Sequence, residues 1–385
     1  MRNNNQSIEL EYYKKNNISP VHYNLRNLKK HFEIRSSLYQ LLGVPPKLVY
    51  GKDVLEVAPG SGHNSIYTAT LMPATYHLVE PNPLGCQDIV NIFKNLSLRH
   101  TKPKLYKLKL GNFKTKKLYD IVITEGWPGG YLDFDKRMLK KLSSFLKPGG
   151  IMLISFFPPI GGMATYLRRL IGYRIISNSD NFKDQTNSLN KAFSSHLINL
   201  KSMSRSNEHW IQDSMLNPYI CVAHNTPELC LKILNHKLQI YNSVPKFADD
   251  WRWYKSLHGK SKNFNENFIL EYNKVSHLLI DYRINSSRRS IKKNRELEKF
   301  CFNFAIKTKD NERLGIKKYK QNIEPLLKKI IQNIKKDLPK NVLQALIEAN
   351  NLLKKKKIDI YDVKEMKYFS SLFGREQCYL SFIKN

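Results

Sequence analysis

Acidic residues and glycines between positions 53 and 80 have the types and the spacing to bind a nucleoside. Glu56, Gly60 and Gly62 lie close together, and Glu80 follows eighteen residues after Gly62. Glycines let a backbone turn approach a ligand closely, and the start of a helix offers unpaired N–H groups. A carboxylate has two acceptor oxygens for the vicinal hydroxyls of a ribose. The pattern predicts a nucleoside site, and an acidic residue here also fits the ribose of a nicotinamide cofactor.

The elements around these residues predict an α/β fold. Residues 54–57 are an apolar run typical of a buried strand, 64–71 have the pattern of a helix that ends before Pro73, and 76–80 are a second strand. Further strands are predicted at 104–110, 120–124, 151–157 and 237–243. Helical patterns separate most of them, which indicates a Rossmann-like, doubly wound and mostly parallel sheet. Its ligand should bind across the carboxyl ends of the strands.

The spacing of the glycine turn narrows the choice of cofactor. Glu56-x-Ala58-x-Gly60-x-Gly62 resembles motif I of the class I S-adenosylmethionine (SAM) dependent methyltransferases, and the "LKPGG" turn at 146–150 resembles the junction before their fifth strand. Ala58 stands where the family commonly has glycine, which leaves less room for the backbone. The resemblance implies that SAM is the cofactor and that Glu80 binds its ribose. The residues that it places at the cofactor are Glu56, Ala58, Gly60, Ser61, Gly62, Asn64, Glu80, Asn112 and Phe113.

Three side chains are candidates for proton transfer on the acceptor side, namely Glu125, His196 and Asp213. Methyl transfer proceeds by in-line attack of the acceptor on the methyl group, and most of the acceleration comes from alignment of the two centres. A hydroxyl acceptor also needs a carboxylate or a histidine to take its proton. Glu125 ranks first, because it follows the fourth predicted strand, where the family places acceptor-side groups. His196 also fits a packing role, and Asp213 also fits an ion pair with Arg205.

Two further segments resemble an uncharacterised bacterial group of class I methyltransferases. One has the pattern "SR…W…D…NP" within 204–218, and the other is "DWRWYK" at 250–255. The resemblance implies a shared acceptor pocket, and the density of rings and charges favours a sugar or another ring-shaped acceptor. A packing role for the first tryptophan and an interdomain hinge at 250–254 are the alternatives. The candidate acceptor contacts are Arg205, Trp210, Trp251, Arg252 and Tyr254.

The charge balance bears on the acceptor. The 385 residues include 64 Lys and Arg against 32 Asp and Glu, a net charge of +32. Such an excess usually indicates nucleic acid or an anionic surface, but Lys far outnumbers Arg and Asn is abundant, which is typical of an AT-rich genome. The "NPPY" or "DPPY" tetrapeptide of amino-methylating enzymes is absent after the fourth predicted strand. The sequence therefore predicts a SAM-dependent methyltransferase for a hydroxyl of a small-molecule or saccharide acceptor. The alternative is an RNA methyltransferase, or a SAM-binding protein whose basic helical tail binds nucleic acid or a partner.

The chain is long enough for one core with appended elements. The predicted segments are an N-terminal helical segment at 1–46, the SAM-binding core at 47–157, a helical lid with the acceptor pocket at 158–236, a return to the core at 237–262 and a helical, Lys-rich region at 263–385. The lysine run at 354–357 is interpreted as a solvated face, and docking on anionic lipid or nucleic acid is its alternative.

Cellular location follows from what the sequence lacks. Residues 1–17 have no apolar stretch of the kind a signal peptide needs, and the longest apolar run is too short to span a bilayer. The five cysteines are an odd set without a CxxC pair, which favours a reducing compartment over disulfides or zinc. We therefore expect a cytoplasmic protein that binds no metal.

Overall fold

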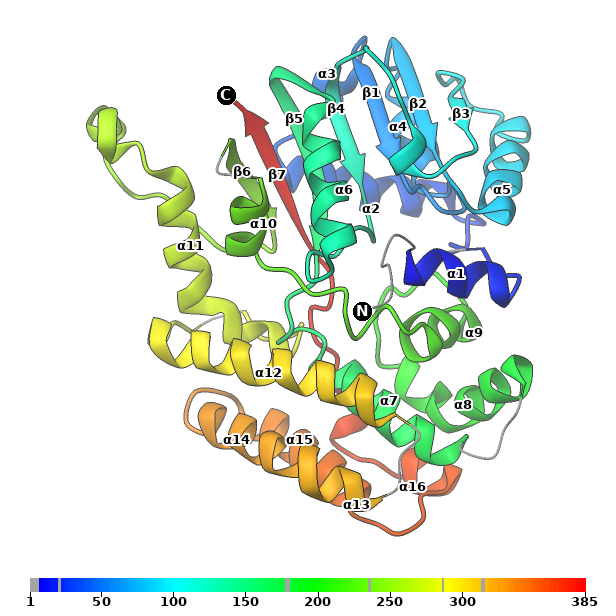
Figure 1. Ribbon diagram of the computed structural model, residues 1–385, viewed down its shortest axis with the longest axis vertical. Coiled ribbons are helices and arrows are strands. Elements are labelled where there is room, and N and C mark those ends of the chain that lie inside the picture. The colour runs from blue at the N-terminus through cyan, green and yellow to red at the C-terminus, as the bar shows by residue number, and fades with distance from the viewer. Residues whose placement is uncertain (1–6, 20–21, 177–180, 235–236, 286, 313–315) are drawn as a thin grey trace. The chain divides into compact units, whose positions relative to one another are not determined.

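Seven strands form one sheet in the computed structural model, which describes residues 7–19, 22–176, 181–234, 237–285, 287–312 and 316–385. The order across the sheet is β3-β2-β1-β4-β5-β7-β6 (Figure 1). Strands β1 to β5 pair in parallel, and β7 runs antiparallel to both β5 and β6. The strands are β1 (Asp53–Val57), β2 (Thr75–Val79), β3 (Lys104–Tyr106), β4 (Tyr119–Thr124), β5 (Leu146–Phe156), β6 (Leu238–Val244) and β7 (Cys378–Lys384).

The predicted Rossmann-like, doubly wound and mostly parallel sheet is confirmed, and this strand order with an antiparallel β7 is typical of the class I methyltransferase fold. The central strands are apolar along their length because both faces of the sheet are covered. On one face the core joins Val54, Ile121 and Ile123 of the sheet to Tyr39 and Tyr67 of the covering helices. The register places the carboxyl ends of β1, β2 and β4 side by side.

Strand β7 corrects the prediction that residues 263–385 are helical throughout. Leu380 and Phe382 are fully buried, and the strand pairs with β5 from Ile151 to Phe156. A strand buried on both faces has no alternation of polar and apolar residues, so its short apolar run does not identify it. The strand predicted at 104–110 is also shorter than expected, since β3 ends at Tyr106 and Leu110–Asn112 form a 3₁₀ turn.

Contacts divide the chain into two units. The first unit is Met1–Phe156, Asn225–Tyr272 and Gln377–Asn385, and it contains the whole sheet. The second is Phe157–His224 and Asn273–Glu376. Most of the predicted lid and of the predicted C-terminal region therefore fold together. The first unit carries the helices α1 (Ile8–Lys15), α2 (Leu28–Leu41), α3 (Pro46–Val49), α4 (Ser65–Thr70), α5 (Pro83–Lys94), α6 (Asp133–Ser144), α10 (Pro227–Ile233) and most of α11 (Phe264–Val275).

The second unit is helical and is built around α7 (Met163–Ile175), whose side chains are buried almost all round. Two of them are arginines. Arg168 donates to the carbonyls of Leu372 at 2.8 Å and Phe369 at 3.2 Å, and Arg169 pairs with Glu312 at 2.6 Å. Arg168 also donates to the carbonyl of Ser370, and Arg169 donates to the carbonyls of Ser214 and Asn217, so backbone oxygens compensate much of the cost of burying the two guanidinium groups. The other α-helices are α8 (Phe182–Leu197), α9 (Asn207–Trp210), α12 (Ile291–Asn311), α13 (Ile316–Lys318), α14 (Glu324–Ile334), α15 (Lys340–Leu353) and α16 (Ile360–Lys364).

The lengths of the helices and the state of the cysteines relate to the predicted cellular location and metal binding. Among the described residues, no helix is both long and apolar enough to cross a membrane. All five cysteines are buried as free thiols.

Candidate functional site

The turn between β1 and α4 lies at the carboxyl end of the sheet. Its backbone is left-handed at Ala58 (φ 55°), Gly60 (φ 61°) and Gly62 (φ 78°). A methyl group added to Gly62 would lie 2.8 Å from the Ile89 side chain of α5, so the turn is closely packed against that helix. The turn predicted from the glycine spacing is therefore present, and its Ala58 adopts a conformation that glycine would adopt without strain.

Glu80 joins the end of β2 to this turn. Its Oε2 accepts the Gly60 N–H at 2.9 Å, and its Oε1 accepts the Asn82 N–H at 2.8 Å. The side chain is buried, which raises the pKa of its carboxyl to about 7, although both backbone donors act in the opposite direction. A carboxylate has about four acceptor sites, so each oxygen keeps one for a ligand hydroxyl.

Helix α5 supports the turn through a residue that the sequence analysis did not single out. A methyl group on Gly85 would lie 2.7 Å from the carbonyl oxygen of Gly60, so only glycine fits there. Asn82 caps the helix, because its side chain accepts the Leu84 N–H at 3.1 Å. The signal for both residues was the segment Asn82-Pro-Leu-Gly85, with proline in the first helical turn.

Glu56, beside the turn, is buried and bonds within the protein. It accepts hydrogen bonds from the Ser65 hydroxyl at 3.0 Å and from the Tyr76 hydroxyl. Burial raises the pKa of Glu56 to about 7, against the lowering effect of Tyr76. The carboxylate thus ties β1 to the start of α4 and to β2, and in this way it fixes the shape of the turn.

The N-terminal segment covers the turn. His31 on α2 bonds through Nε2 to the carbonyl of His63 at 3.0 Å, and the His63 ring bonds to the Ser61 hydroxyl at 2.7 Å. The carbonyl of Ile18 accepts a hydrogen bond from the Asn82 side chain at 3.1 Å. Burial lowers the pKa of His63 to about 4, so the His63 ring is uncharged at neutral pH.

Asn112 and Phe113, which were predicted at the cofactor, lie at the 3₁₀ turn after β3 and differ in exposure. Asn112 is exposed, and a methyl group on the neighbouring Gly111 would meet nothing within 4 Å. Phe113 is buried, with its ring centroid 5.0 Å from that of Tyr106 and 5.5 Å from that of Phe145. Asn112 is therefore accessible to a ligand at this turn, and Phe113 packs beneath it.

Glu125 follows β4 and forms an ion pair with Arg35 of α2. Arg35 Nη1 lies 2.9 Å from Oε2, Arg35 Nη2 bonds to Oε1, and the Asn64 side chain donates to Oε2 at 3.3 Å. The side chains are only 6% and 14% exposed. Asn64 begins α4, so this ion pair lies beside the glycine turn. Arg35 was missed, because nothing in the sequence links it to a residue 90 positions away.

Hydrogen bonds to Ser155 and Asn225 hold the loop after Glu125 in place. Gly126 donates its N–H to the Ser155 hydroxyl of β5 at 2.7 Å, and Gly129 accepts from the Asn225 side chain at 2.7 Å. Tyr379, at the start of β7, pairs with Ser155 across the sheet. Burial raises the pKa of its phenol well above the usual value, and the carboxylate of Glu125 adds to this effect. Tyr379 was missed together with its strand.

The other two proton-transfer candidates lie in the second unit. His196 is fully buried between the rings of Phe193 and Phe369, and its Nε2 bonds to the carbonyl of Val363 at 2.9 Å. Burial lowers the pKa of His196 to about 3. This geometry agrees with the packing role that was the alternative for His196.

The acceptor contacts predicted in the "SR…W…D…NP" segment also have structural partners. Arg205 pairs with Asp213 at 2.8 Å, and Trp210 is buried with its ring edge-on to Phe373. The structure thus brings Arg205 and Asp213 together, as the ion-pair alternative expected. The contacts predicted in the "DWRWYK" box belong to the first unit, where Trp251 is 93% and Tyr254 68% exposed. Arg252 bonds to Asp250 through Nε at 2.8 Å.

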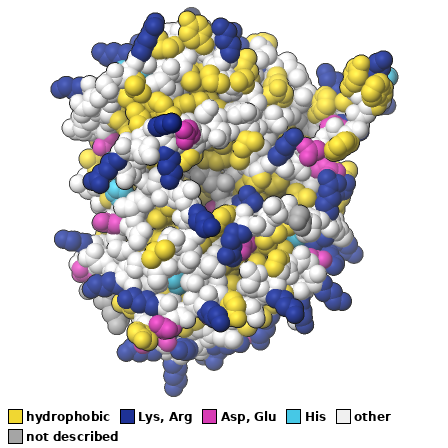
Figure 2. Space-filling model, turned by 180° about the vertical axis from the view of Figure 1, so that it is seen from behind, with side chains coloured by type: hydrophobic (Ala, Val, Ile, Leu, Met, Phe, Trp, Pro, Cys, Tyr) yellow, Lys and Arg dark blue, Asp and Glu magenta, His cyan; other side chains and the backbone are white. Residues whose placement is uncertain are grey.

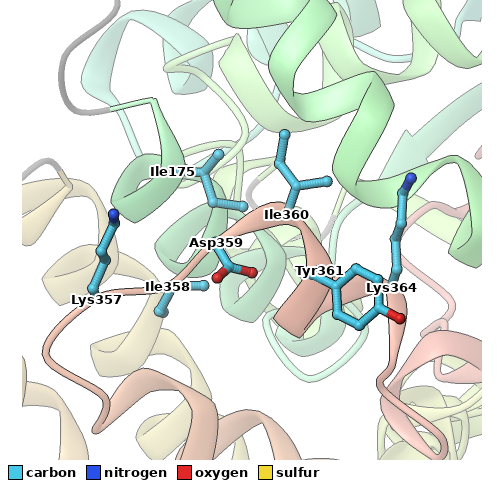
Figure 3. A pocket seen from close by; sticks show the side chains of 7 residues that line it. All are labelled: Ile175, Lys357, Ile358, Asp359, Ile360, Tyr361 and Lys364. Carbon is cyan, nitrogen blue, oxygen red and sulfur yellow. The ribbon is translucent and has the colours of Figure 1, made fainter.

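The second unit has a hollow of about 480 Å³ in its surface beside α16 (Figure 3). Ile175, Ile358 and Ile360 supply apolar side chains, and Lys357 and Lys364 stand at its two sides. Asp359 is occupied as the cap of α16, where it accepts the Asp362 N–H at 2.9 Å. None of the predicted site residues lines this hollow. Among the described residues, no group of His, Cys, Asp and Glu has the arrangement of a metal site.

Comparisons with known proteins identify relatives in fold only. No family model and no curated protein matches the sequence. A SAM-dependent methyltransferase from Clostridium acetobutylicum ATCC 824 is 19% identical over 35% of this chain and 55% of its own, with a TM-score of 0.29. The N-methyltransferase NodS from Bradyrhizobium japonicum WM9, in complex with S-adenosyl-L-homocysteine, is 11% identical over 64% of this chain and 93% of its own, with a TM-score of 0.35.

A third similar structure is magnesium protoporphyrin IX methyltransferase from Synechocystis PCC 6803 with bound S-adenosyl-L-homocysteine. It is 13% identical over 62% of this chain and 87% of its own, with a TM-score of 0.35. The chain spans little more than half of the length of the first of these structures. Likenesses of this size assign no activity. The fold rests on the order and directions of the strands, and the function must be argued from the site.

Proposed function

We propose that this chain is a SAM-dependent methyltransferase acting on a hydroxyl of a small-molecule or saccharide acceptor. The observation that carries the proposal is Glu80. Its carboxylate directly follows β2 and accepts the amides of Gly60 and Asn82, one at each oxygen, so its acceptor capacity exceeds these two bonds and suits a vicinal diol. A ligand of a doubly wound sheet binds at this edge of the strands.

The residues present fit the cofactor. Gly60 and Gly62 add no side chains to the turn, Glu80 offers acceptors to a ribose, and Asn112 is exposed where an adenine would lie. When bound, SAM supplies a methyl group on a cationic sulfur. Glu56 supports the site from beneath, because its carboxylate holds the turn through Ser65 and Tyr76.

Glu125 is the proposed acceptor-side carboxylate. Arg35 and Asn64 together use three of its roughly four acceptor sites, two of them on Oε2. The site that remains, on Oε1, is available to an acceptor hydroxyl. The ion pair with Arg35 fixes the orientation of the carboxylate, so Glu125 orients the acceptor hydroxyl and takes its proton. His196 and Asp213 rank behind it, because both belong to the second unit, whereas Glu125 follows a strand of the sheet that carries the glycine turn.

Calorimetric titration with SAM tests the donor site. Wild type should bind, and Glu80→Gln should lose about 10–100-fold in affinity, since hydrogen bonds to a charged group contribute ~1.5–3 kcal/mol. Glu33→Gln, which changes an exposed carboxylate on α2 of the same unit, is the matched control and should bind as wild type does. Absence of SAM binding, or tighter binding of NAD, would overturn the proposal.

Transfer of a labelled methyl group tests the acceptor. Wild type should label a hydroxyl in a mixture of saccharides and hydroxylated metabolites, and Glu125→Gln should reduce the rate by about 100-fold or more, as expected for loss of a group in proton transfer. If RNA is labelled instead and SAM binding is intact, the proposal of methyl transfer stands, but the proposed saccharide or small-molecule acceptor is wrong.

A further inference from the structure

Residues 246–262, which we call the aromatic loop, expose large aromatic side chains. Trp251, Trp253 and Tyr254 are 93%, 63% and 68% exposed. The loop projects from the start of α11 at the upper left of Figure 1, and at the upper right of Figure 2 hydrophobic side chains cover its tip. Exposed aromatic residues grouped in this way mark an interaction surface, whereas single exposed residues are ordinary.

The base of the loop is held in place by its own hydrogen bonds. Arg252 donates through Nε to Asp250 at 2.8 Å and through Nη1 to the carbonyl of Ser261 at 3.0 Å. Phe247, just before the loop tip, is buried against Phe268 and Tyr272 of α11. The aromatic tip is therefore presented by an ordered base. The side chain of Arg252 is engaged within the loop.

Lysines lie on the same loop as the aromatic tip. Lys255 lies 5.7 Å from the ring centroid of Trp253 and 6.0 Å from that of Tyr254, and Lys260 and Lys262 are exposed on the same loop. Trp and Tyr favour the interface between lipid headgroups and acyl chains, and lysine side chains reach from there to the headgroups. Each lysine near an anionic bilayer contributes on its own to binding.

We propose that the aromatic loop docks this protein on the surface of an anionic lipid bilayer. The tip is convex, so it suits insertion between headgroups, whereas a saccharide site requires a concave surface. The rings of Trp253 and Tyr254 are inclined by 50°, and the guanidinium of Arg252 is already bonded, so a stacking platform for single-stranded RNA is less well matched. The net charge of +32 complements an anionic membrane. The proposal concerns the first unit alone and is independent of methyl transfer.

Co-sedimentation of the full chain with vesicles tests the proposal. Binding is compared between vesicles of pure phosphatidylcholine and vesicles containing 30% phosphatidylglycerol, a composition chosen as about that of an anionic surface. Wild type should bind the anionic vesicles, and the triple variant Trp251→Ser, Trp253→Ser, Tyr254→Ser should lose at least about tenfold in partitioning, because the apolar area of three rings is removed. Tyr50→Ser is the matched control, since Tyr50 is 60% exposed with Lys47 5.3 Å from its ring centroid.

Tryptophan fluorescence identifies the part of the chain that enters the bilayer. The chain has four tryptophans, of which Trp127 and Trp210 are buried, so a blue shift on anionic vesicles would come from the aromatic loop. Brominated acyl chains should quench the emission of wild type and leave that of the triple variant unchanged. Raising NaCl from about 0.1 to 1 M should weaken binding, because the Debye length falls from ~10 to ~3 Å.

Three results would overturn the proposal. The first is equal binding by wild type and the triple variant. The second is binding of single-stranded RNA, or formation of a dimer, that the triple variant abolishes in the absence of lipid. The third is a blue shift without quenching by brominated lipid, which would place the rings against protein. All arms are carried out without SAM, so a failure here is distinct from a failure of the proposed methyl transfer.

Discussion

Ala58 adopts a left-handed backbone, with φ at 55°, in the middle of the glycine turn. This conformation costs an L-residue ~1–2 kcal/mol, whereas glycine adopts it without strain but loses more entropy on folding. We expect Ala58→Gly to raise the free energy of unfolding of the first unit by about 0.5–1 kcal/mol. Hydrogen exchange of the β1 amides would measure the change. The control is Ala69→Gly inside α4, which should destabilise, and destabilisation by both changes would contradict the argument.

Glu80 gives the site a pH dependence. Its folded pKa of about 7 lies above the ordinary 4.5, so its contribution to stability is present below pH 4.5 and is lost as pH rises through 7. Glu80→Gln does not titrate, so the free energy of unfolding of wild type should fall relative to this variant by at most ~3 kcal/mol between pH 5 and 8. Urea denaturation of both proteins at several pH values measures the difference. A constant difference would mean that Glu80 is already ionised at pH 5.

Spacing along the chain revealed the turn residues but not their tertiary partners. Gly60 and Glu80 were predicted because a turn after a buried strand and an acid at the end of the next strand have local signatures. Arg35 and Tyr379 reach the site from α2 and β7, far away in sequence, so no local pattern could identify them. For His196 the sequence left a base and a packing residue open, because burial is a property of the folded chain.

Helix α2 is tied to the sheet by the ion pair of Arg35 and Glu125. Replacing one partner leaves the other buried and uncompensated, so Arg35→Met should destabilise the first unit by about 3 kcal/mol. In the double variant Arg35→Met, Glu125→Met no charge is left, and at least half of this loss should be recovered. Hydrogen exchange of β4 amides reports both values. If the losses simply add, the two side chains do not stabilise each other.

At the level of elements, apolar patterns predicted six of the strands and the helix at 64–71. The helix before Pro73 and the strands at 54–57 and 151–157 were found because apolar runs bounded by glycine or proline have few other interpretations. The last strand was missed because its neighbours β5 and β6 lie far away in the sequence. Only pairing across the sheet distinguishes its residues from the end of a helix.

For the whole molecule, β7 joins β6 to the rest of the sheet, since it lies between β5 and β6. Deleting residues 377–385 would remove fully buried side chains and two ladders of hydrogen bonds. We expect the first unit to lose its protection against limited proteolysis, while deletion of Asn385 alone, outside the strand, should have no effect. A protease-resistant first unit after the longer deletion would show that the remaining strands close the sheet by themselves.

The position of β7 also sets an order of events during synthesis. The synthesis of strand β5 is complete when the chain has reached Phe156, but its partner strand begins only at Cys378. Because synthesis proceeds at about 5–20 residues per second, the edge of β5 stays unpaired for on the order of tens of seconds. An open strand edge is prone to pair with other chains. Nascent chains stalled before residue 378 should therefore bind chaperones along β5, and release of the last strand should end that binding at once.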